Sequence, residues 1–351
     1  MNVVTKEFGK TKDGTVVHLY TIKNRNGMEL VVSDYGAVIQ SIRVPDKDGK
    51  PVDVVLGYDD VKGYEDNAES LGSFVGRNAN RIKDAKVTID GKVYELEKND
   101  GENNLHSGSD RSHYKVYEAE TMEDVDMASV EFSRLFPDME QKLPGNTDFT
   151  VTYSLTENNE VILEYFAVSD KATVINPTNH SYFNLNGEGN GDILDNIMTI
   201  YSDAFTPTDD HLIPTGEIRD VTGTPLDFRT AKPVGRDINE DYLPLKQAGG
   251  YDHNFVLKTR DGESVKCAEL VSPKTGIKME VFTDLPGMQV YSGNFLENKK
   301  GKGGKIYNKR DGICFETQFF PNACNEPEFK SPILPAGKEF ESATIYKFSS
   351  K

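Results

Sequence analysis

The chain has 351 residues, and 57 acidic residues against 40 Lys and Arg give it a formal net charge of −17 at pH 7. This excess of acid disfavours nucleic acid as a partner, because binding to phosphates depends on clustered basic residues. Hydrophobic residues make up 36% of the chain and charged residues 28%, a balance that is typical of a globular protein and excludes a disordered one. The composition therefore favours a small neutral molecule as the substrate.

Strong signals for membranes, secretion or disulfides are missing from the sequence. No apolar run reaches the roughly 18 residues of a membrane span, and the first residues lack the apolar core of a signal peptide. Cys267, Cys314 and Cys324 are too few for a disulfide framework. We therefore expect a cytoplasmic protein without a membrane partner, a monomer or weak homodimer, in which Cys314 is a buried, inert cysteine.

Alternation of apolar and polar residues predicts β-strands along most of the chain. The clearest hairpin joins 86–89 to 93–96 through an Asp-Gly turn at Asp90. In 148–156 every odd position is apolar, which places Phe149 and its alternating neighbours on one face, and 161–166 is its expected partner strand. Further strands are predicted at 15–22, 28–44, 127–134, 197–205, 277–283, 288–296, 313–320 and 342–348.

The expected fold is one large all-β domain over residues 1–351, a sandwich or barrel with few short helical turns such as 59–64. No shift in composition marks a domain boundary, and no internal repeat is evident. Because closing such a sheet pairs strands that are distant in sequence, residues of one site can come from far apart in the chain.

Two residues stand out as candidates for proton transfer. His180 lies in the polar run Asn176–Leu185, where a simple buried strand would carry Val and Ile. Glu316 lies between aromatic residues, and alternation places it on the same strand face as Cys314, opposite Phe315. A carboxylate among aromatics is costly to bury without a function or a charged partner.

Other polar residues lie beside Gly and Asn. Asp252 follows Gly249-Gly250-Tyr251, a loop expected to enter a strand at 254–258, and alternation points the neighbouring His253 away from a shared site. Arg77 is expected to brace its loop by an ion pair. His18, His113 and His211 are interpreted as surface or strand residues.

In six segments the chain resembles the aldose 1-epimerase, or galactose mutarotase, family. The segments occur in the family's order between residues 76 and 325, and together they are far more specific than any one alone. They are Gly76–Ile82, Asn104–His106, Asn179–Leu185, Tyr251–Phe255, Pro286–Tyr291 with Gly293-Asn294, and Glu316–Gln318.

The resemblance implies a galactose mutarotase-like β-sandwich that interconverts the α and β anomers of free aldohexoses such as galactose and glucose, without a cofactor or metal. It assigns Glu316 as the general base and His180 as the general acid. His106 and Arg81 fall where the family contacts the ring oxygen and nearby hydroxyls. The further sugar-binding positions are Asn80, Tyr182, Asp252 and Gln289.

The chain departs from the family pattern at two points. Ser107 replaces the usual Gly after the first histidine, and the chain has no Trp, with Tyr117 at a position where the family often has one. Sugar stacking must then come from Phe or Tyr. Neither change removes a group that handles protons.

The chemistry agrees with these assignments. Mutarotation removes a proton from the anomeric hydroxyl and delivers one to the ring oxygen, so one base and one acid suffice. At ordinary pKa values, about 4.3 for Glu and about 6.5 for His, Glu316 is ionised at neutral pH and His180 is poised to donate.

Three alternatives remain open at the level of sequence. A hexose-6-phosphate epimerase would need cations, for which the run Lys299–Lys305 is the candidate, although this run is interpreted as a solvated loop. A sugar-binding module without turnover is the second. The third is a metal site formed by His106, His180 and Glu316, although these histidines lack the close His-x-His or His-x-x-x-His spacing that such sites often show.

Overall fold

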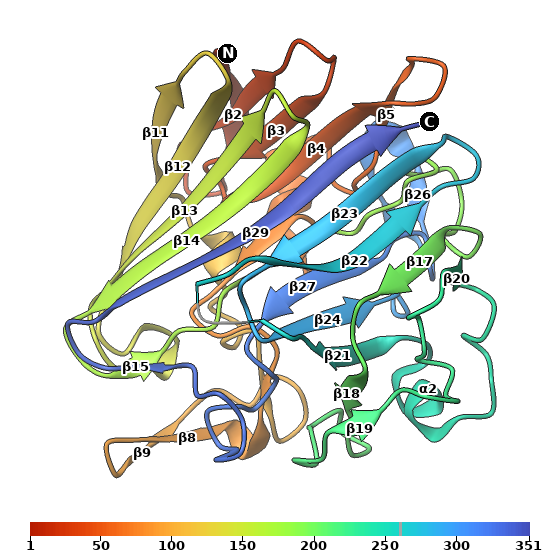
Figure 1. The fold of residues 1–351 in the computed structure, drawn as a ribbon. Coiled ribbons are helices and arrows are strands. Elements are labelled where there is room, and N and C mark those ends of the chain that lie inside the picture. Colours follow the sequence, from red (N-terminus) through yellow and green to blue (C-terminus); the bar gives the residue numbers. More distant parts are fainter. Residues whose placement is uncertain (260–261) are drawn as a thin grey trace.

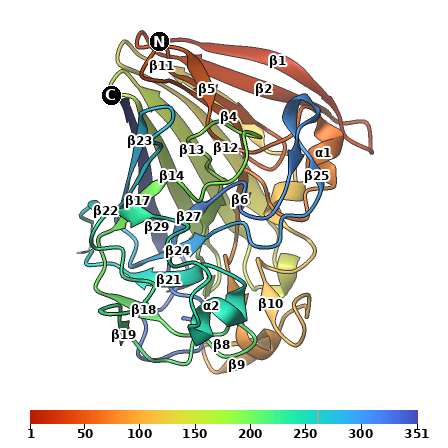
Figure 2. The same ribbon diagram turned by 90° about the vertical axis from the view of Figure 1, so that its right-hand side faces the viewer.

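A computed structural model describes residues 1–259 and 262–351, and β-strands dominate it. Both termini lie at one end of the molecule, and the hairpin of β8 (Lys86–Ile89) and β9 (Lys92–Glu95) lies at the other (Figures 1 and 2). Every ladder between the named strands is antiparallel, which is what the many short turns in the sequence favour.

The first layer is a sheet of nine strands. In spatial order the strands are β11 (Glu118–Glu123), β12 (Met127–Phe136), β13 (Thr147–Thr156), β14 (Glu160–Ser169), β29 (Glu339–Ser350), β23 (Ile277–Thr283), β22 (Val265–Val271), β17 (Ile197–Ile200) and β20 (Lys232–Pro233).

The second layer contains two sheets of five strands. One has the order β1 (Val3–Lys10), β2 (Val16–Lys23), β3 (Glu29–Ser33), β4 (Val38–Pro45) and β5 (Pro51–Asp53). The other has the order β19 (Arg219–Asp220), β18 (Ala204–Thr206), β21 (Asp252–Val256), β24 (Gly287–Tyr291) and β27 (Cys314–Gln318). Phe183 joins the two, because it forms antiparallel bridges with Val55 on one side and Ile313 on the other.

Short elements complete the chain. The two-stranded ladders are β6 (Ser73–Val75) with β16 (Thr178–His180), β7 (Arg81–Ile82) with β10 (Asn104–Leu105), β8 (Lys86–Ile89) with β9 (Lys92–Glu95), β15 (Thr173–Val174) with β28 (Ile333–Leu334), and β25 (Lys299–Lys300) with β26 (Ile306–Tyr307). The helices are α1 (Val61–Glu65) and α2 (Leu243–Ala248), with 3₁₀ turns η1 (Lys83–Ala85), η2 (Ser112–Tyr114), η3 (Glu140–Lys142) and η4 (Lys302–Gly304). None of the described helices is long and apolar enough to cross a membrane.

The hydrophobic core lies between the layers. The alternating residues of β13 are buried as predicted, and Phe149 and Val151 share one apolar cluster with Val290 and Phe315 from the second layer. Strand alternation therefore leaves the opposite face of β24 and β27 available for polar residues.

The strand predictions are largely confirmed, with four corrections. The strand predicted at 288–296 ends at Tyr291. The run 28–44 is two strands, β3 and β4, separated by a turn, and 197–205 divides between β17 and β18 in different sheets. The strand expected at 254–258 begins at Asp252 instead. Alternation alone cannot locate these breaks, because a bend keeps the apolar pattern while changing the partner strand.

Arg77 holds together the loops next to the polar face. Its side chain is fully buried, and its guanidinium donates hydrogen bonds to Thr147 Oγ1 and to carbonyl oxygens. Those carbonyls belong to Glu140, Leu143, Pro144 and Gly145. Arg77 therefore braces its loop as expected. The prediction of an ion pair is wrong, because the partners of the guanidinium are mainly backbone carbonyl oxygens. Burial lowers the pKa of Arg77 to about 10, so the group remains a cation at neutral pH.

Arg77→Met should lower the free energy of unfolding by about 3 kcal/mol or more, because several buried carbonyls lose their donor. Arg25→Met is the matched control, since the Arg25 side chain is 70% exposed and its ion pairs should contribute less than about 1 kcal/mol. Urea unfolding measures both variants, and equal effects would contradict this account of Arg77.

Candidate active site

A cavity of about 230 Å³ opens on the polar side of β27. Its lining contains every site residue expected from the sequence except Gln289: Asn80, Arg81, His106, His180, Tyr182, Asp252 and Glu316. Residues from five separate regions of the chain therefore converge on one cavity.

Backbone pairing between Phe183, which follows β16, and Ile313, which directly precedes β27, brings His180 close to Glu316. Phe183 N–H donates to Ile313 O at 2.8 Å, and Ile313 N–H donates to Phe183 O at 2.9 Å. Gly312 permits this approach, because a Cβ there would lie 2.8 Å from the Cβ of Tyr182. As a result, His180 Nε2 lies 3.6 Å from Glu316 Oε1, and both side chains are buried.

The ladder of β7 and β10 positions the second histidine. His106 follows β10 with φ of 52°, and its Nδ1 accepts a hydrogen bond from the Asn80 N–H at 3.1 Å. Its Nε2 is thereby left for the cavity. Arg81 donates from Nε to Asp100 Oδ2 at 2.8 Å, which holds the guanidinium at the cavity wall.

Asp252 and Gln289 form a hydrogen-bonded pair beside Glu316. Gln289 Nε2 donates to Asp252 Oδ1 at 2.6 Å, and Gln289 lies directly opposite Glu316 in the ladder of β24 and β27. His253 faces the other way, as expected, with its Nδ1 accepting from the Asp252 N–H and its ring near Phe205.

The two departures from the family pattern have structural explanations. Ser107 adopts φ of 66°, where Gly is easier, and its hydroxyl both accepts from Asn78 N–H and donates to Asn78 O. These hydrogen bonds offset the backbone strain. Tyr117 is buried away from the cavity, and its hydroxyl donates to Ser112 O at 3.0 Å.

Burial dominates the electrostatics and corrects the expectation of ordinary pKa values. It raises the pKa of Glu316 well above the ordinary value; the charge of Asp252 raises it further, while that of Arg81 lowers it. Burial lowers the pKa of His180 to about 4, and that of His106 falls well below its usual range for the same reason. The site therefore favours uncharged forms of both proton-handling groups.

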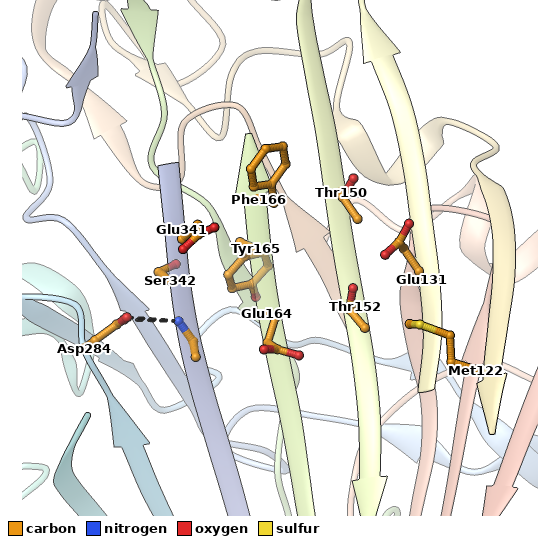
Figure 3. A pocket seen from close by; sticks show the side chains of 11 residues that line it. Met122, Glu131, Thr150, Thr152, Glu164, Tyr165, Phe166, Asp284, Glu341 and Ser342 are labelled. Carbon is orange, nitrogen blue, oxygen red and sulfur yellow. Dashed lines mark hydrogen bonds between the residues drawn. The ribbon is translucent and has the colours of Figure 1, made fainter. Parts of the chain in front are cut away.

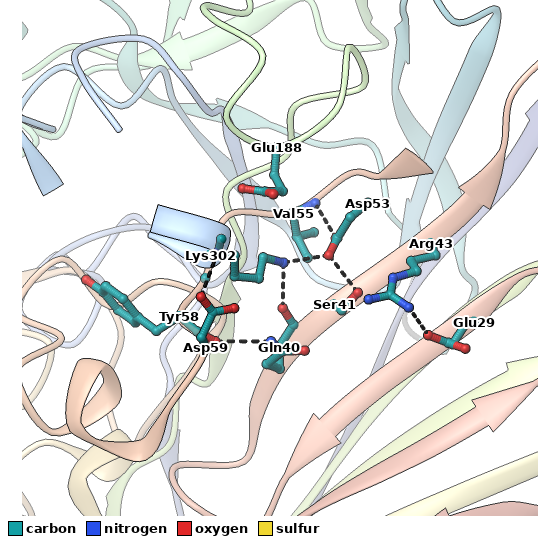
Figure 4. Close-up of polar contacts among 12 residues, drawn as sticks. Glu29, Gln40, Ser41, Arg43, Asp53, Val55, Tyr58, Asp59, Glu188 and Lys302 are labelled. Carbon is teal, nitrogen blue, oxygen red and sulfur yellow. Dashed lines mark hydrogen bonds and ion pairs between the residues drawn. The ribbon is translucent and has the colours of Figure 1, made fainter. Parts of the chain in front are cut away.

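The basic run Lys299–Lys305 is exposed at Lys300 and at 303–305, as the interpretation as a solvated loop expects, but ion pairs of Lys299, Lys302 and Lys305 anchor it. Figure 4 shows Lys302 Nζ between Asp53 Oδ2, at 2.7 Å, and Gln40 O, at 2.9 Å. Lys299 pairs with Glu69, and Lys305 pairs with Glu188. Because these cations already bind carboxylates, the run offers little support for a phosphate site.

A larger hollow of about 670 Å³ lies on the nine-stranded sheet and carries different chemistry. Figure 3 shows its carboxylates Glu131, Glu164, Asp284 and Glu341 across neighbouring strands. Its described lining residues include no histidine, lysine or arginine. Without a paired acid and base, this hollow is the weaker candidate for catalysis.

His106, His180 and Glu316 also offer ligand atoms within 4.8 Å of one another, a convergence that sequence spacing did not reveal. The same convergence serves acid–base catalysis on an organic substrate. Elemental analysis and activity measured before and after chelation distinguish a metal site from metal-free acid–base catalysis. Stoichiometric metal and loss of activity on chelation would indicate a metal site.

Sequence reasoning missed several cavity residues and misplaced one histidine. Arg111 holds the cavity wall by donating to Ala68 O at 2.7 Å, and Phe295 lies at the mouth, 64% exposed and stacked near Tyr291. Phe295 directly follows the Gly293-Asn294 motif, which was the available signal. His113 is buried in η2, which corrects its placement on the surface or a strand.

Comparison with known proteins adds independent findings. A family profile described as aldose 1-epimerase matches residues 18–347. Galactose mutarotase from Sus scrofa is 38% identical over 351 residues, which cover 99% of each chain. Aldose 1-epimerase from Escherichia coli (strain K12) is 35% identical over 341 residues, which cover 96% of each chain.

Solved structures agree with these matches. Galactose 1-epimerase from Lactobacillus acidophilus NCFM superposes with a TM-score of 0.87 at 27% identity, covering 99% of each chain. An aldose epimerase homologue from C. elegans gives a TM-score of 0.84 at 31% identity, covering 95% of this chain and 98% of its own.

NMR titration should show His180 uncharged from pH 8 down to about 5, with protonation centred near its lowered pKa of about 4. The direction follows from burial, which penalises the imidazolium. The ring signal is assigned by its loss in His180→Asn. A titration midpoint near the ordinary 6.5 would contradict the desolvated site.

Proposed function

This chain belongs to the aldose 1-epimerase family, and from that membership we propose that Glu316 and His180 are the base and acid of its reaction. The protein is an isomerase, a mutarotase that interconverts the α and β anomers of small sugars. The observation that carries the assignment is the 3.6 Å approach of His180 Nε2 to Glu316 Oε1 in a cavity lined by polar groups.

Ring opening transfers two protons. The reacting form is the minor, ionised one, in which the proton of Glu316 has moved to His180 Nε2. Ionised Glu316 then takes the proton of the O1 hydroxyl, and the C1–O1 bond becomes a carbonyl double bond as the C1–O5 bond breaks. The electron pair of that bond moves to O5, which takes a proton from His180 Nε2. The products on the enzyme are the open aldehyde, a protonated Glu316 and a neutral His180.

Ring closure reverses these transfers after rotation about the C1–C2 bond. O5 attacks the other face of the aldehyde carbon and returns its proton to His180 Nε2. Glu316 returns its proton to O1, so the opposite anomer leaves and the enzyme regains its starting state. Neither step needs an oxidant or a second substrate.

The pair holds one proton throughout, and the burial of both groups determines where that proton prefers to lie. The uncharged arrangement, neutral His180 with protonated Glu316, is the one that accompanies the open aldehyde. Arg81 opposes this preference, because its charge lowers the pKa of Glu316. The raised pKa also makes Glu316 a stronger base once it is ionised.

Sugar recognition is assigned to the remaining polar groups. His106 and Arg81 contact the ring oxygen and nearby hydroxyls, while Asn80, Tyr182 and Asp252 bind further hydroxyls. Gln289 contributes through its hydrogen bond to Asp252, and its Oε1 is buried without a protein partner, which leaves an acceptor for a sugar hydroxyl. Galactose and glucose are the proposed aldohexoses.

The proposal extends to the cellular setting. Three unpaired cysteines support a reducing, cytoplasmic location, and the acidic charge argues against nucleic acid and membrane partners. Residues from both layers share one core cluster, which supports a single domain. A monomer or weak homodimer is the proposed state.

Polarimetry on freshly dissolved α-galactose, α-glucose and α-glucose 6-phosphate tests the activity and its substrate range. We expect the neutral sugars to be converted and the phosphate to be a poor substrate. Calorimetric binding of galactose without faster anomer exchange would overturn the catalytic function and favour a binding module.

Glu316→Gln should lower kcat by about a thousandfold, because the amide cannot accept the O1 proton. Glu164→Gln is the matched control, an exposed glutamate on the outer face of β14, and it should retain full activity. Polarimetric progress curves measure both. Full acceleration by Glu316→Gln would refute the assigned base.

Phe295→Ala should raise KM roughly 3- to 10-fold with little change in kcat, because an exposed ring at the cavity mouth can stack on the sugar. Leu243→Ala is the control, since Leu243 is equally exposed at 64% and lies on α2 outside the cavity lining. A KM equal to that of the unmodified enzyme would exclude Phe295 from sugar binding.

A further inference from the structure

The ring of His180 has a second close contact besides Glu316. Its Nδ1 lies 3.5 Å from Cys314 Sγ, within hydrogen-bonding reach of a sulfur. Cys314 is fully buried, and His180 is 6% exposed, so water does not compete easily for this contact. The two ring nitrogens therefore have different partners, a sulfur at Nδ1 and a carboxylate at Nε2.

The reaction requires one of the two tautomers. His180 gives its Nε2 proton to O5 and later takes a proton back at Nε2, so the neutral ring must carry its remaining proton on Nδ1. A buried Nδ1–H needs an acceptor, and leaving it without one would be costly. Without that acceptor, the neutral ring can carry its proton on Nε2 or turn over, and either change removes the proton acceptor from the cavity.

Cys314 is suited to accept this hydrogen bond. Burial raises the pKa of its thiol well above the ordinary value, and the nearby carboxylates Glu316 and Asp252 raise it further, so the sulfur remains a neutral thiol. A neutral acceptor orients the imidazole without the strong attraction for imidazolium that a carboxylate would add. This agrees with the low pKa of His180.

The same strand, β27, carries both Cys314 and Glu316, the two residues that His180 contacts. Cys314 and Glu316 are two positions apart on β27, so strand alternation places both on the face that meets His180. The same bridge between Phe183 and Ile313 that brings His180 to the base also fixes its distance from the sulfur. The rings of Tyr182 and Tyr291 flank His180, with centroids 5.1 Å and 6.2 Å from it.

We propose that Cys314 is a positioning residue whose sulfur accepts the Nδ1–H of His180 and holds the ring with Nε2 facing the sugar. The role of this contact in turnover rests on the proposed function of His180. The geometry itself is a property of the free enzyme and is open to measurement without substrate.

Kinetics with α-galactose test the role in turnover. Cys314→Ala should lower kcat about tenfold at nearly constant KM, while Cys314→Ser, which keeps an acceptor, should retain most of the activity. Cys324→Ala is the control, because Cys324 packs in a separate apolar cluster and is not among the residues that line the cavity, so kcat should be unchanged. Full kcat in Cys314→Ala, or equal losses in the Ala and Ser variants, would overturn the proposal.

A spectroscopic measurement tests the tautomer independently of catalysis. The ¹⁵N shifts of the His180 ring at pH 7 should show protonated Nδ1 in the unmodified enzyme and in Cys314→Ser, and a mixture of tautomers in Cys314→Ala. An Nε2–H tautomer in the unmodified enzyme, or no change in Cys314→Ala, would overturn the proposal. If Glu316→Gln keeps full activity, the acid–base assignment fails instead, whatever the tautomer.

Discussion

The active geometry depends on the backbone pairing between Phe183 and Ile313. This bridge joins the two sheets of the second layer, and it places the end of β16 next to the start of β27. Gly312 leaves room for this approach, because a Cβ there would lie 2.8 Å from the Cβ of Tyr182. Because two backbone hydrogen bonds form this bridge directly before β27, the 3.6 Å approach of His180 to Glu316 is held by the backbone of the fold.

Burial sets the pKa values of His180 and Glu316. An exposed glutamate and histidine at the same distance would form a weak ion pair at neutral pH, whereas the enclosed cavity disfavours both charges. Burial therefore favours the arrangement in which Glu316 holds the proton and His180 is neutral. The opposing charges of Arg81 and Asp252 adjust this balance from two sides of the base.

Much of the surrounding structure keeps the cavity walls in place. Arg77 ties together carbonyls of the loop at 140–145, Arg111 holds the segment at 68–70, and Lys299 pairs with Glu69 in the same segment. Lys302 and Lys305 anchor the remainder of the basic run to Asp53 and Glu188. The lysines of the basic run, which in the sequence are the candidates for a phosphate site, are thus used inside the protein to fix loops around the cavity.

The sequence by itself determined the local features: the all-β class, most strands, the face of β27 that carries Cys314 and Glu316, and the segments shared with the family. These follow from alternation and short motifs, which depend only on neighbouring residues. The tertiary structure decided which strands pair, and hence that positions 180 and 316 meet, that Lys302 is buried against Asp53, and that Cys314 contacts His180. It also decided the pKa values, because desolvation depends on everything that packs around a group and no local pattern records it.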